Sequence, residues 1–370
     1  MIVAPAGRAL AASARRSGFR PLVLDLFDDL DTRAFAVANV SIDAMEHGFE
    51  AEDLIDPLLC LAQGRDPAGI VYGGGFEDRP QLIAELARHF RLYGNTAETV
   101  ERVKDPQWLA TLCRELAIPH PEIRFARPRD PEHWLIKKSG GGGGLHIALA
   151  SSRTAEPGEY YQRRVSGQPI SAMLLCAARS KLQILGLSEQ WATASSGKPF
   201  RFAGAARPAN IAPELAGQIA AAAEAIAARA GLVGLNSVDF LADNDGFHLL
   251  EINPRPGATL DIYSDCDGKI FVAHIDACEG RLPTAPLIFP RAAAASIVYT
   301  PIDLTPMPPL VWPEWCHDRQ KPGTDLRKGD PVCTVSAEAE SIAAARALLD
   351  ERLAVFLKIL TESASKEAAA

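Results

Sequence analysis

Two acidic side chains and an asparagine have the types and the spacing of a metal site. Asp239 and Glu251 each interrupt an apolar run, in strands expected over residues 233–242 and 246–253. Because side chains alternate along a strand, Glu251 and Asn253 face one side, and the hairpin brings Asp239 to the same place. Two carboxylates and an amide oxygen suit Mg²⁺ that also holds nucleotide phosphates. The alternative, that both acids face solvent, is weakened because an acid within a buried run is costly unless its charge is coordinated.

A cation follows this set directly. Arg255 lies between Pro254 and Pro256, which restrict the backbone on both sides. Next to a bound metal, the guanidinium would stabilise charge that develops on a transferring phosphoryl group or on an acyl phosphate. The alternative is an ordinary surface arginine in a loop.

Five consecutive glycines, Gly140–Gly144, lie between strands expected over 133–138 and 145–150. A flexible linker between domains is one explanation. Two hydrophobic strands would not normally frame a linker so closely, however. A hairpin loop whose backbone approaches a phosphate therefore fits better.

The elements that would hold these residues change character along the chain. Up to residue 93, short apolar strands alternate with helical patterns, which is typical of a parallel sheet that binds ligands beyond the carboxyl ends of its strands. Tyr72–Glu77 follows one such strand, and it is either a substrate contact or only a tight turn. No G-x-G-x-x-G follows the first strand, which argues against a dinucleotide-dependent dehydrogenase. Later elements are expected as helices over 94–118, 212–230 and 337–361 and as strands over 159–165, 170–178, 181–191 and 332–335.

Composition limits the classes of protein that remain. The chain has 370 residues, 48% of them hydrophobic, so two or three domains with their own cores are expected. A formal net charge of -8 argues against nucleic acid as the main partner. No apolar run approaches the ~20 residues that span a bilayer, and Met1–Leu10 lacks the apolar region of a signal peptide. Seven scattered cysteines without a C-x-x-C pair suit reduced thiols. We therefore expect a soluble, cytoplasmic protein with neither nucleic acid nor membrane partners.

At this point the residues carry a resemblance. Asp239-Phe240 and the run from Glu251 to Arg255 resemble the metal-binding end of the ATP-grasp superfamily of ligases, as in biotin carboxylase and D-alanine-D-alanine ligase. Residues 134–144 resemble that family's strand, lysine and glycine-rich phosphate loop. Residues 160–167 are similar to its hinge strand, which binds adenine through the backbone, and Lys104 stands where it keeps a first phosphate-binding lysine. The four matches come in the family's order and cover about residues 90–260.

The resemblance implies an α/β class ATP-grasp fold with an α+β lid and a Rossmann-like N-terminal domain. The expected division is an N-terminal domain over 1–93, the lid with its glycine-rich loop over 94–205, the metal-binding core over 206–290 and a C-terminal segment without an assigned role over 291–370.

The resemblance also implies roles for single residues, with ATP and Mg²⁺ as cofactors. Two magnesium ions are expected, with Mn²⁺ as an alternative, on Asp239, Glu251 and Asn253. Arg255 and Lys137 would be catalytic. Nucleotide contacts would come from Lys104, Lys137, Gly141, Gly142, Gly143, Gly144, Gln162, Arg163 and Val165, and candidate substrate contacts from Tyr72, Gly74, Glu77 and Asp261. Lys138, where many members have proline, and Arg163, where an acid often follows the hinge glutamine, depart from the family pattern.

A narrower match, on short motifs such as Tyr72–Glu77 and Gly94-Asn95, is similar to small ATP-grasp proteins of one-carbon cofactor pathways, including tyramine-glutamate ligase. It implies an ATP-dependent carboxylate-amine ligase that joins glutamate to a tyrosine- or tyramine-like amine through an acyl phosphate. A carboxylate kinase or phosphotransferase and an ATP-binding regulatory module stay open as alternatives. The expected partners are small-molecule acid and amine substrates, with a homodimer as one open assembly.

Overall fold

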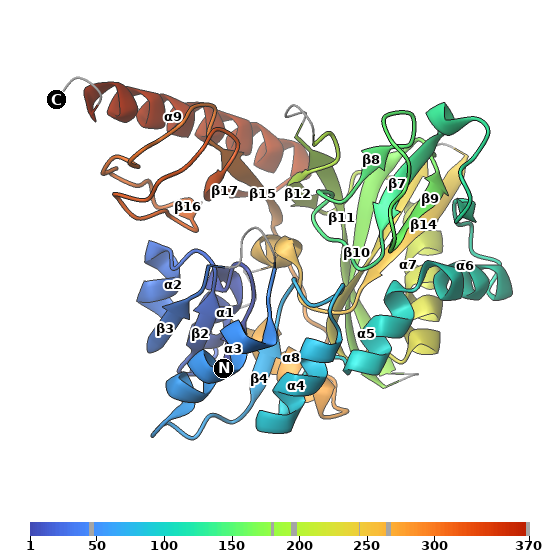
Figure 1. Cartoon of the computed structure of the whole chain (residues 1–370), viewed down its shortest axis with the longest axis horizontal. Coiled ribbons are helices and arrows are strands. Elements are labelled where there is room, and N and C mark those ends of the chain that lie inside the picture. Colours follow the sequence, from blue (N-terminus) through green and yellow to red (C-terminus); the bar gives the residue numbers. More distant parts are fainter. Residues whose placement is uncertain (44–47, 179–180, 194–197, 244, 264–267, 368–370) are drawn as a thin grey trace.

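A computed structural model of the chain describes residues 1–43, 48–178, 181–193, 198–243, 245–263 and 268–367. The strands within these ranges form three sheets (Figure 1). A five-stranded sheet has the order β3-β2-β1-β4-β5, a four-stranded sheet the order β6-β9-β7-β8, and an eight-stranded sheet the order β14-β13-β10-β11-β12-β15-β17-β16. The expected α/β class is confirmed. The four-segment division of the chain stays a prediction.

The N-terminal sheet is parallel throughout and has helices on both faces. Ile2, Val23 and Val71 pack towards α1, whereas Val3 and Leu24 pack towards α3 and α4. Because both faces are covered, β1 and β4 in the middle of the sheet are apolar and buried along their whole length. The elements are β1 (Ile2–Val3), α1 (Arg8–Arg16), β2 (Leu22–Asp25), α2 (Leu30–Phe35), β3 (Ala38–Ser41), α3 (Ala51–Ala62), β4 (Ile70–Tyr72), α4 (Gln81–His89) and β5 (Leu92–Tyr93).

The second sheet is small and antiparallel, and it carries the glycine run. β7 pairs with β8 around this run, with Leu135 opposite Leu149, so the expected hairpin is confirmed. Trp134, Ile136 and Tyr161 form the centre of its own small core. The elements of this region are α5 (Ala97–Lys104), α6 (Pro106–Glu115), β6 (Ile123–Arg124), η1 (Pro131–His133), β7 (Trp134–Lys138), β8 (Ala148–Leu149) and β9 (Glu159–Arg163).

The eight-stranded sheet is antiparallel and central to the molecule. Ile219 and Ile226 of α7 cover one face, and this helix ends at Gly231, which has a φ of 67°, as the pattern predicts. Helix α8 covers part of the other face, and α9 packs on β15 and β17 (Figure 1). The elements are β10 (Gln168–Ala178), β11 (Lys181–Ala192), β12 (Phe202–Arg207), α7 (Pro213–Ala230), β13 (Gly234–Asp243), β14 (Gly246–Asn253), η2 (Ala258–Tyr263), α8 (Lys269–Cys278), β15 (Ala292–Tyr299), β16 (Cys316–His317), β17 (Pro331–Ala339) and α9 (Ile342–Glu367).

One sequence-based expectation for the C-terminal part needs correction. The last helix begins at Ile342 and not near 337, because Ala337 continues β17 opposite Ala294. The alanines of 292–295, for which the sequence predicted no element, are all buried and belong to strand β15.

Two further expectations concern cysteines and membranes. Six of the seven cysteines are free thiols, and Cys266 lies outside the described residues. No helix within the described ranges is long and apolar enough to cross a membrane.

His274 of α8 is buried where the N-terminal sheet meets the central sheet. Its Nδ1 accepts a hydrogen bond from the Leu235 backbone N–H at 2.9 Å, so the proton is on Nε2, 3.2 Å from the Tyr93 carbonyl. Burial lowers the pKa of His274 to about 4 from 6.5. The folded protein therefore holds a neutral imidazole at this junction.

We expect the His274→Gln variant to lose less stability in acid than the wild type. Between pH 6.5 and pH 4 the unfolded wild-type chain gains a proton that the folded chain does not, so its stability falls as the pH drops through this window. Glutamine does not titrate. The free energy of unfolding of the wild type, minus that of the variant, should fall by about 3 kcal/mol from pH 7 to pH 4. Urea titrations at each pH measure the free energy of unfolding of both proteins. Parallel pH profiles would contradict a neutral His274 in the folded protein.

Candidate active site

A cavity of about 1130 Å³ lies where the three sheets meet. Strands β7 and β9 of the small sheet line one side, and β13 and β14 of the central sheet line another. Ala6 and Phe27 of the N-terminal domain and residues 329–334 of the C-terminal segment complete it. The C-terminal segment, to which the sequence assigned no role, therefore contributes a wall.

The three expected metal ligands come together in this cavity. Asp239 on β13 lies directly opposite Glu251 on β14, as the hairpin predicts. Asn253 donates from Nδ2 to Asp239 Oδ2 at 2.8 Å. Ser171 on β10, which the sequence analysis missed, donates to Asp239 Oδ1 at 2.6 Å. Its only sequence signal is a hydroxyl within an otherwise apolar strand.

The surroundings shift the pKa values of the two carboxylates in opposite directions. Burial, followed by the charge of Glu251, raises the pKa of Asp239. Burial also acts to raise the pKa of Glu251, but Lys104 and Lys137 more than offset it, so this pKa is lowered. Two acids at close range in a low dielectric repel each other, and a divalent cation between them would relieve that repulsion.

Two lysines from separate elements lie at the acid pair. Lys104, at the end of α5, places Nζ 3.1 Å from Asn253 Oδ1 and 3.6 Å from Glu251 Oε2. Lys137 on β7 is only 4% exposed. Burial acts to lower the pKa of Lys137, but Tyr160 and the two acids raise it overall, so it is charged. Lysines held in this way are suited to bind phosphate oxygens.

Arg255 connects the site to the N-terminal domain. Its Nε donates to Glu77 Oε1 at 2.7 Å, and Glu77 Oε2 accepts from the Gly75 backbone N–H at 2.8 Å. Burial acts to lower the pKa of Arg255, but Glu77 raises it more. Gly74 faces the same guanidinium, since a Cβ there would lie 3.5 Å from its Nε. The Gly74–Glu77 loop thus positions Arg255 without lining the cavity itself.

Two other candidate substrate residues lie away from the cavity wall. Tyr72 is buried and donates its hydroxyl to the Asn95 carbonyl at 2.8 Å. Asp261 forms a two-pronged ion pair with Arg8 of α1. Neither belongs to the cavity lining, so neither is placed to touch a molecule bound there.

The expected hinge residues line the cavity together. Gln162, Arg163 and Val165 all do so. Arg163 also donates to Asp130 Oδ2 at 2.7 Å, so it is tied to the small sheet. The Nε2 of Gln162 is buried and has no hydrogen-bond partner in the described part of the chain. A buried amide without a partner is costly, and a ligand acceptor would satisfy it.

The glycine loop is only partly in contact with the cavity. Gly143 and Gly144 line it, whereas Gly141 and Gly142 do not. The Gly143 carbonyl accepts from the Phe202 backbone N–H at 3.0 Å, which ties the loop to β12. At Gly144, with a φ of +73°, a Cβ would lie 1.8 Å from the Phe200 carbonyl oxygen. Only glycine allows this approach of two backbones.

This donor set fits a nucleotide with a divalent ion. Carboxylate and amide oxygens, the buried Lys137, an orphaned amide and a backbone cradle face one cavity, and Lys104 supports the acid pair from beside it. No group of three or more His, Cys, Asp or Glu side chains in the described ranges is arranged to hold a metal by itself. An ion on Asp239 and Glu251 would therefore take its other ligands from Asn253, water and phosphate.

Comparisons with known proteins agree with this site. The family model described as ATP-grasp domain matches residues 107–259, which span the glycine loop and all three expected metal ligands. No curated protein sequence matches the chain significantly. Residues 107–259 therefore form an ATP-grasp domain.

Several solved structures share the fold. Pyruvate carboxylase from Rhizobium etli has a TM-score of 0.72 at 16% identity, over 95% of this chain and only 36% of its own. The biotin carboxylase β,γ-ATP complex from Campylobacter jejuni has a TM-score of 0.69 at 14% identity, over 94% of this chain and 89% of its own. N5-carboxyaminoimidazole ribonucleotide synthetase from Thermus thermophilus has a TM-score of 0.67 at 19% identity, over 97% of this chain and 98% of its own. At such identities the likeness establishes the fold alone.

We expect Gly144→Ala to weaken nucleotide binding. A side chain in the left-handed region costs about 1–2 kcal/mol, and the contact with Phe200 would in addition push the loop away from β12. The affinity for ADP, measured by calorimetric titration, should fall about tenfold or more. Gly142→Ala is the matched control, because nothing lies within 4 Å of a Cβ there. Equal affinities of the two variants for ADP would contradict a role of the Gly144 backbone in nucleotide binding.

Proposed function

We propose that this chain is an ATP-dependent carboxylate-amine ligase that forms an amide through an acyl phosphate. The observation that carries the proposal is that Asp239, Glu251, Asn253 and Lys137 line one cavity, while Lys104 contacts Glu251 and Asn253 beside it. This arrangement neutralises anionic phosphates, and chemistry of that kind needs no nucleophile from the protein. It therefore supports phosphoryl transfer by positioning and charge neutralisation.

Each group has a proposed role. Asp239, Glu251 and Asn253 would hold two Mg²⁺ ions, with Mn²⁺ as an alternative, and the ions would supply Lewis-acid neutralisation of phosphate charge. Lys104 and Lys137 would neutralise phosphate oxygens, and the amides of the glycine run would close over them. The hinge residues 162–165 would hold the adenine. The similar biotin carboxylase of Campylobacter jejuni, whose structure is a complex with β,γ-ATP, supports this assignment.

The proposed chemistry has two steps. A carboxylate oxygen of the acid substrate attacks the γ-phosphorus of ATP, a P–O bond forms, and ADP leaves. The amine nitrogen then attacks the acyl carbon, the C–N bond forms, and the C–O bond to phosphate breaks. Phosphate leaves and, with solvent, takes up the amine proton. Arg255, held by Glu77, would stabilise the charge on the acyl phosphate.

The substrates that we propose to test first are glutamate and a tyramine-like amine, as in a one-carbon cofactor pathway. Release of ADP and of phosphate is measured while amino acids are paired with candidate amines, and products are identified by mass spectrometry. Phosphate release should require both an acid and an amine. Full turnover without an amine would favour the alternative, a carboxylate kinase, and nucleotide binding without any turnover would favour a regulatory module. The cytoplasmic location and a homodimer stay predictions.

Glu251→Gln should abolish ADP release and leave the fold intact. The substitution keeps the shape of the side chain but removes one of the two negative charges that face each other. Phosphoryl transfer should therefore slow by about a hundredfold or more. The far-ultraviolet circular dichroism spectrum should match that of the wild type, because Asp239 keeps a negative charge beside Lys104. Glu224→Gln, on the exposed face of α7, is the matched control. Wild-type turnover in Glu251→Gln would refute the proposed site.

A further inference from the structure

One end of the cavity is formed by other segments of the chain than those that carry the acid pair and the lysines. Ala6 and Phe27, which follow β1 and β2 of the N-terminal sheet, meet Asp318, Gln320 and Thr334 of the C-terminal segment there. The carboxyl ends of parallel strands are a usual place for a ligand. Here the strand ends face a wall formed by the C-terminal segment, which the sequence did not predict.

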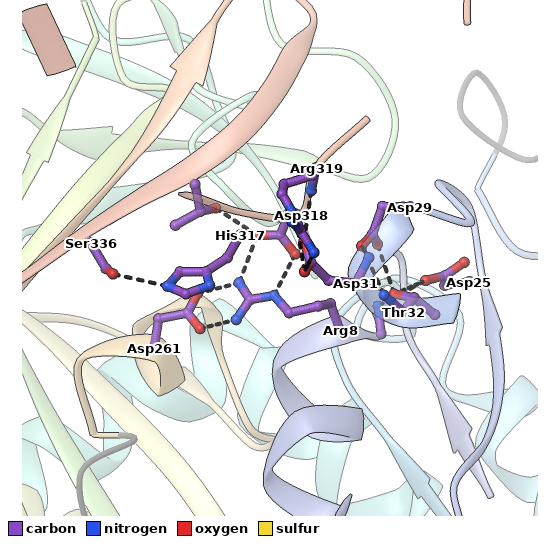
Figure 2. A network of polar contacts seen from close by, with 12 residues as sticks. Arg8, Asp25, Asp29, Asp31, Thr32, Asp261, His317, Asp318, Arg319 and Ser336 are labelled. Carbon is purple, nitrogen blue, oxygen red and sulfur yellow. Dashed lines mark hydrogen bonds and ion pairs between the residues drawn. The ribbon is translucent and has the colours of Figure 1, made fainter. Parts of the chain in front are cut away.

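Asp318 belongs to a cluster with more acids than cations (Figure 2). Its carboxylate accepts from Arg8 Nε at 2.8 Å and Nη2 at 2.6 Å, and from the Thr334 hydroxyl at 2.6 Å. Arg8 also binds Asp261, so one guanidinium serves two carboxylates. The neighbouring Arg319 is occupied by Asp31.

The remaining neighbours do not restore neutrality. His317 lies beside this pair and hydrogen-bonds to Ser336, and burial lowers its pKa, so it adds no positive charge at neutral pH. Burial, followed by the charge of Asp318, raises the pKa of Asp29 to about 6, and at neutral pH this acid is ionised as well. The Asp318 side chain is 25% exposed, and it presents this excess negative charge to the cavity.

A second, independent feature of this end points to a ligand. Gln320 lines the same cavity and is only 4% exposed. Its backbone N–H donates to the Val332 carbonyl at 3.3 Å, but its side-chain amide has no hydrogen bond to any residue of the described ranges. A buried amide that faces a cavity without a partner is satisfied when a bound molecule supplies a donor or an acceptor.

We propose that this end of the cavity binds the amine substrate as a primary ammonium ion, on the carboxylate of Asp318 and the amide oxygen of Gln320. Phe27 and Ala6 offer an apolar surface for the carbon chain of that amine. The proposal rests on the proposed ligase function, whose amine it places. Asp318 is a specificity residue here. The cavity thus offers cations to phosphate and acyl phosphate and, at Asp318, an anion to the ammonium ion, which gives one proton to solvent before its nitrogen attacks.

The test compares amines with alcohols of the same skeleton. Binding of each member is measured by calorimetry with MgADP present, for pairs that run from butylamine and butanol to tyramine and tyrosol. At least one amine should bind about tenfold more tightly than its alcohol, and Asp318→Asn should remove most of this preference. Asp325→Asn, an exposed acid outside the cavity, is the matched control and should keep the preference.

A second variant guards against a folding defect in Asp318→Asn. Gln320→Met removes the amide, keeps the volume and leaves the backbone bond to Val332, and it should weaken amine binding at least threefold without changing alcohol binding. No preference in any pair, or a preference that survives in both variants, overturns the proposal. Because the measurement needs no turnover, failure of the ligase function appears separately, as absent ADP release with any acid and amine.

Discussion

Two half-buried carboxylates that lie opposite each other on one hairpin constrain the residues around them. Asp239 and Glu251 are held in register by backbone pairing, so they cannot separate to relieve their repulsion. The surrounding structure must therefore bring positive charge to them. It does so from α5 with Lys104, from β7 with Lys137, and from the loop after β14 with Arg255. The meeting of three sheets at this point follows from the need to balance that charge in a low dielectric.

The same constraint explains why the N-terminal domain packs where it does. Arg255 cannot be buried beside the acids without a partner of its own, and Glu77 from the N-terminal domain is that partner. Arg8 performs the corresponding task on the other side, with Asp261 and Asp318. Removing one member of a buried pair leaves an uncompensated charge, which typically costs about 3–5 kcal/mol. These ion pairs, together with a shared apolar core that includes Leu10 and Phe271, join the N-terminal sheet to the central sheet.

Much of this arrangement could be predicted from the sequence, where the signal is local. Alternation along 246–253 placed Glu251 and Asn253 on one face, and apolar strands around Gly140–Gly144 indicated the hairpin. The C-terminal wall could not be found in this way. Asp318 and Gln320 lie in an irregular segment without periodicity. Contacts of Asp318 with Arg8 and of Arg319 with Asp31, about 300 residues away, help to hold that segment at the cavity.

Asp261 shows the opposite limit. It was a candidate substrate contact, but whether an acid faces a substrate or a distant arginine depends on tertiary packing that no short pattern encodes. The glycine run is a milder case. Its existence predicted a backbone cradle, yet only the structure shows that Gly143 and Gly144 form the part facing the cavity.

The bond between Arg8 and Asp318 joins residues 310 positions apart in the chain. A ribosome therefore synthesises Arg8 long before it reaches Asp318. Until the C-terminal segment emerges, the guanidinium lacks half of its acidic partners and the cavity lacks one wall. A growing chain can therefore pair strands β10 to β14 of the central sheet before it has the residues that form this wall. The order of synthesis itself delays a complete site until that segment has been made.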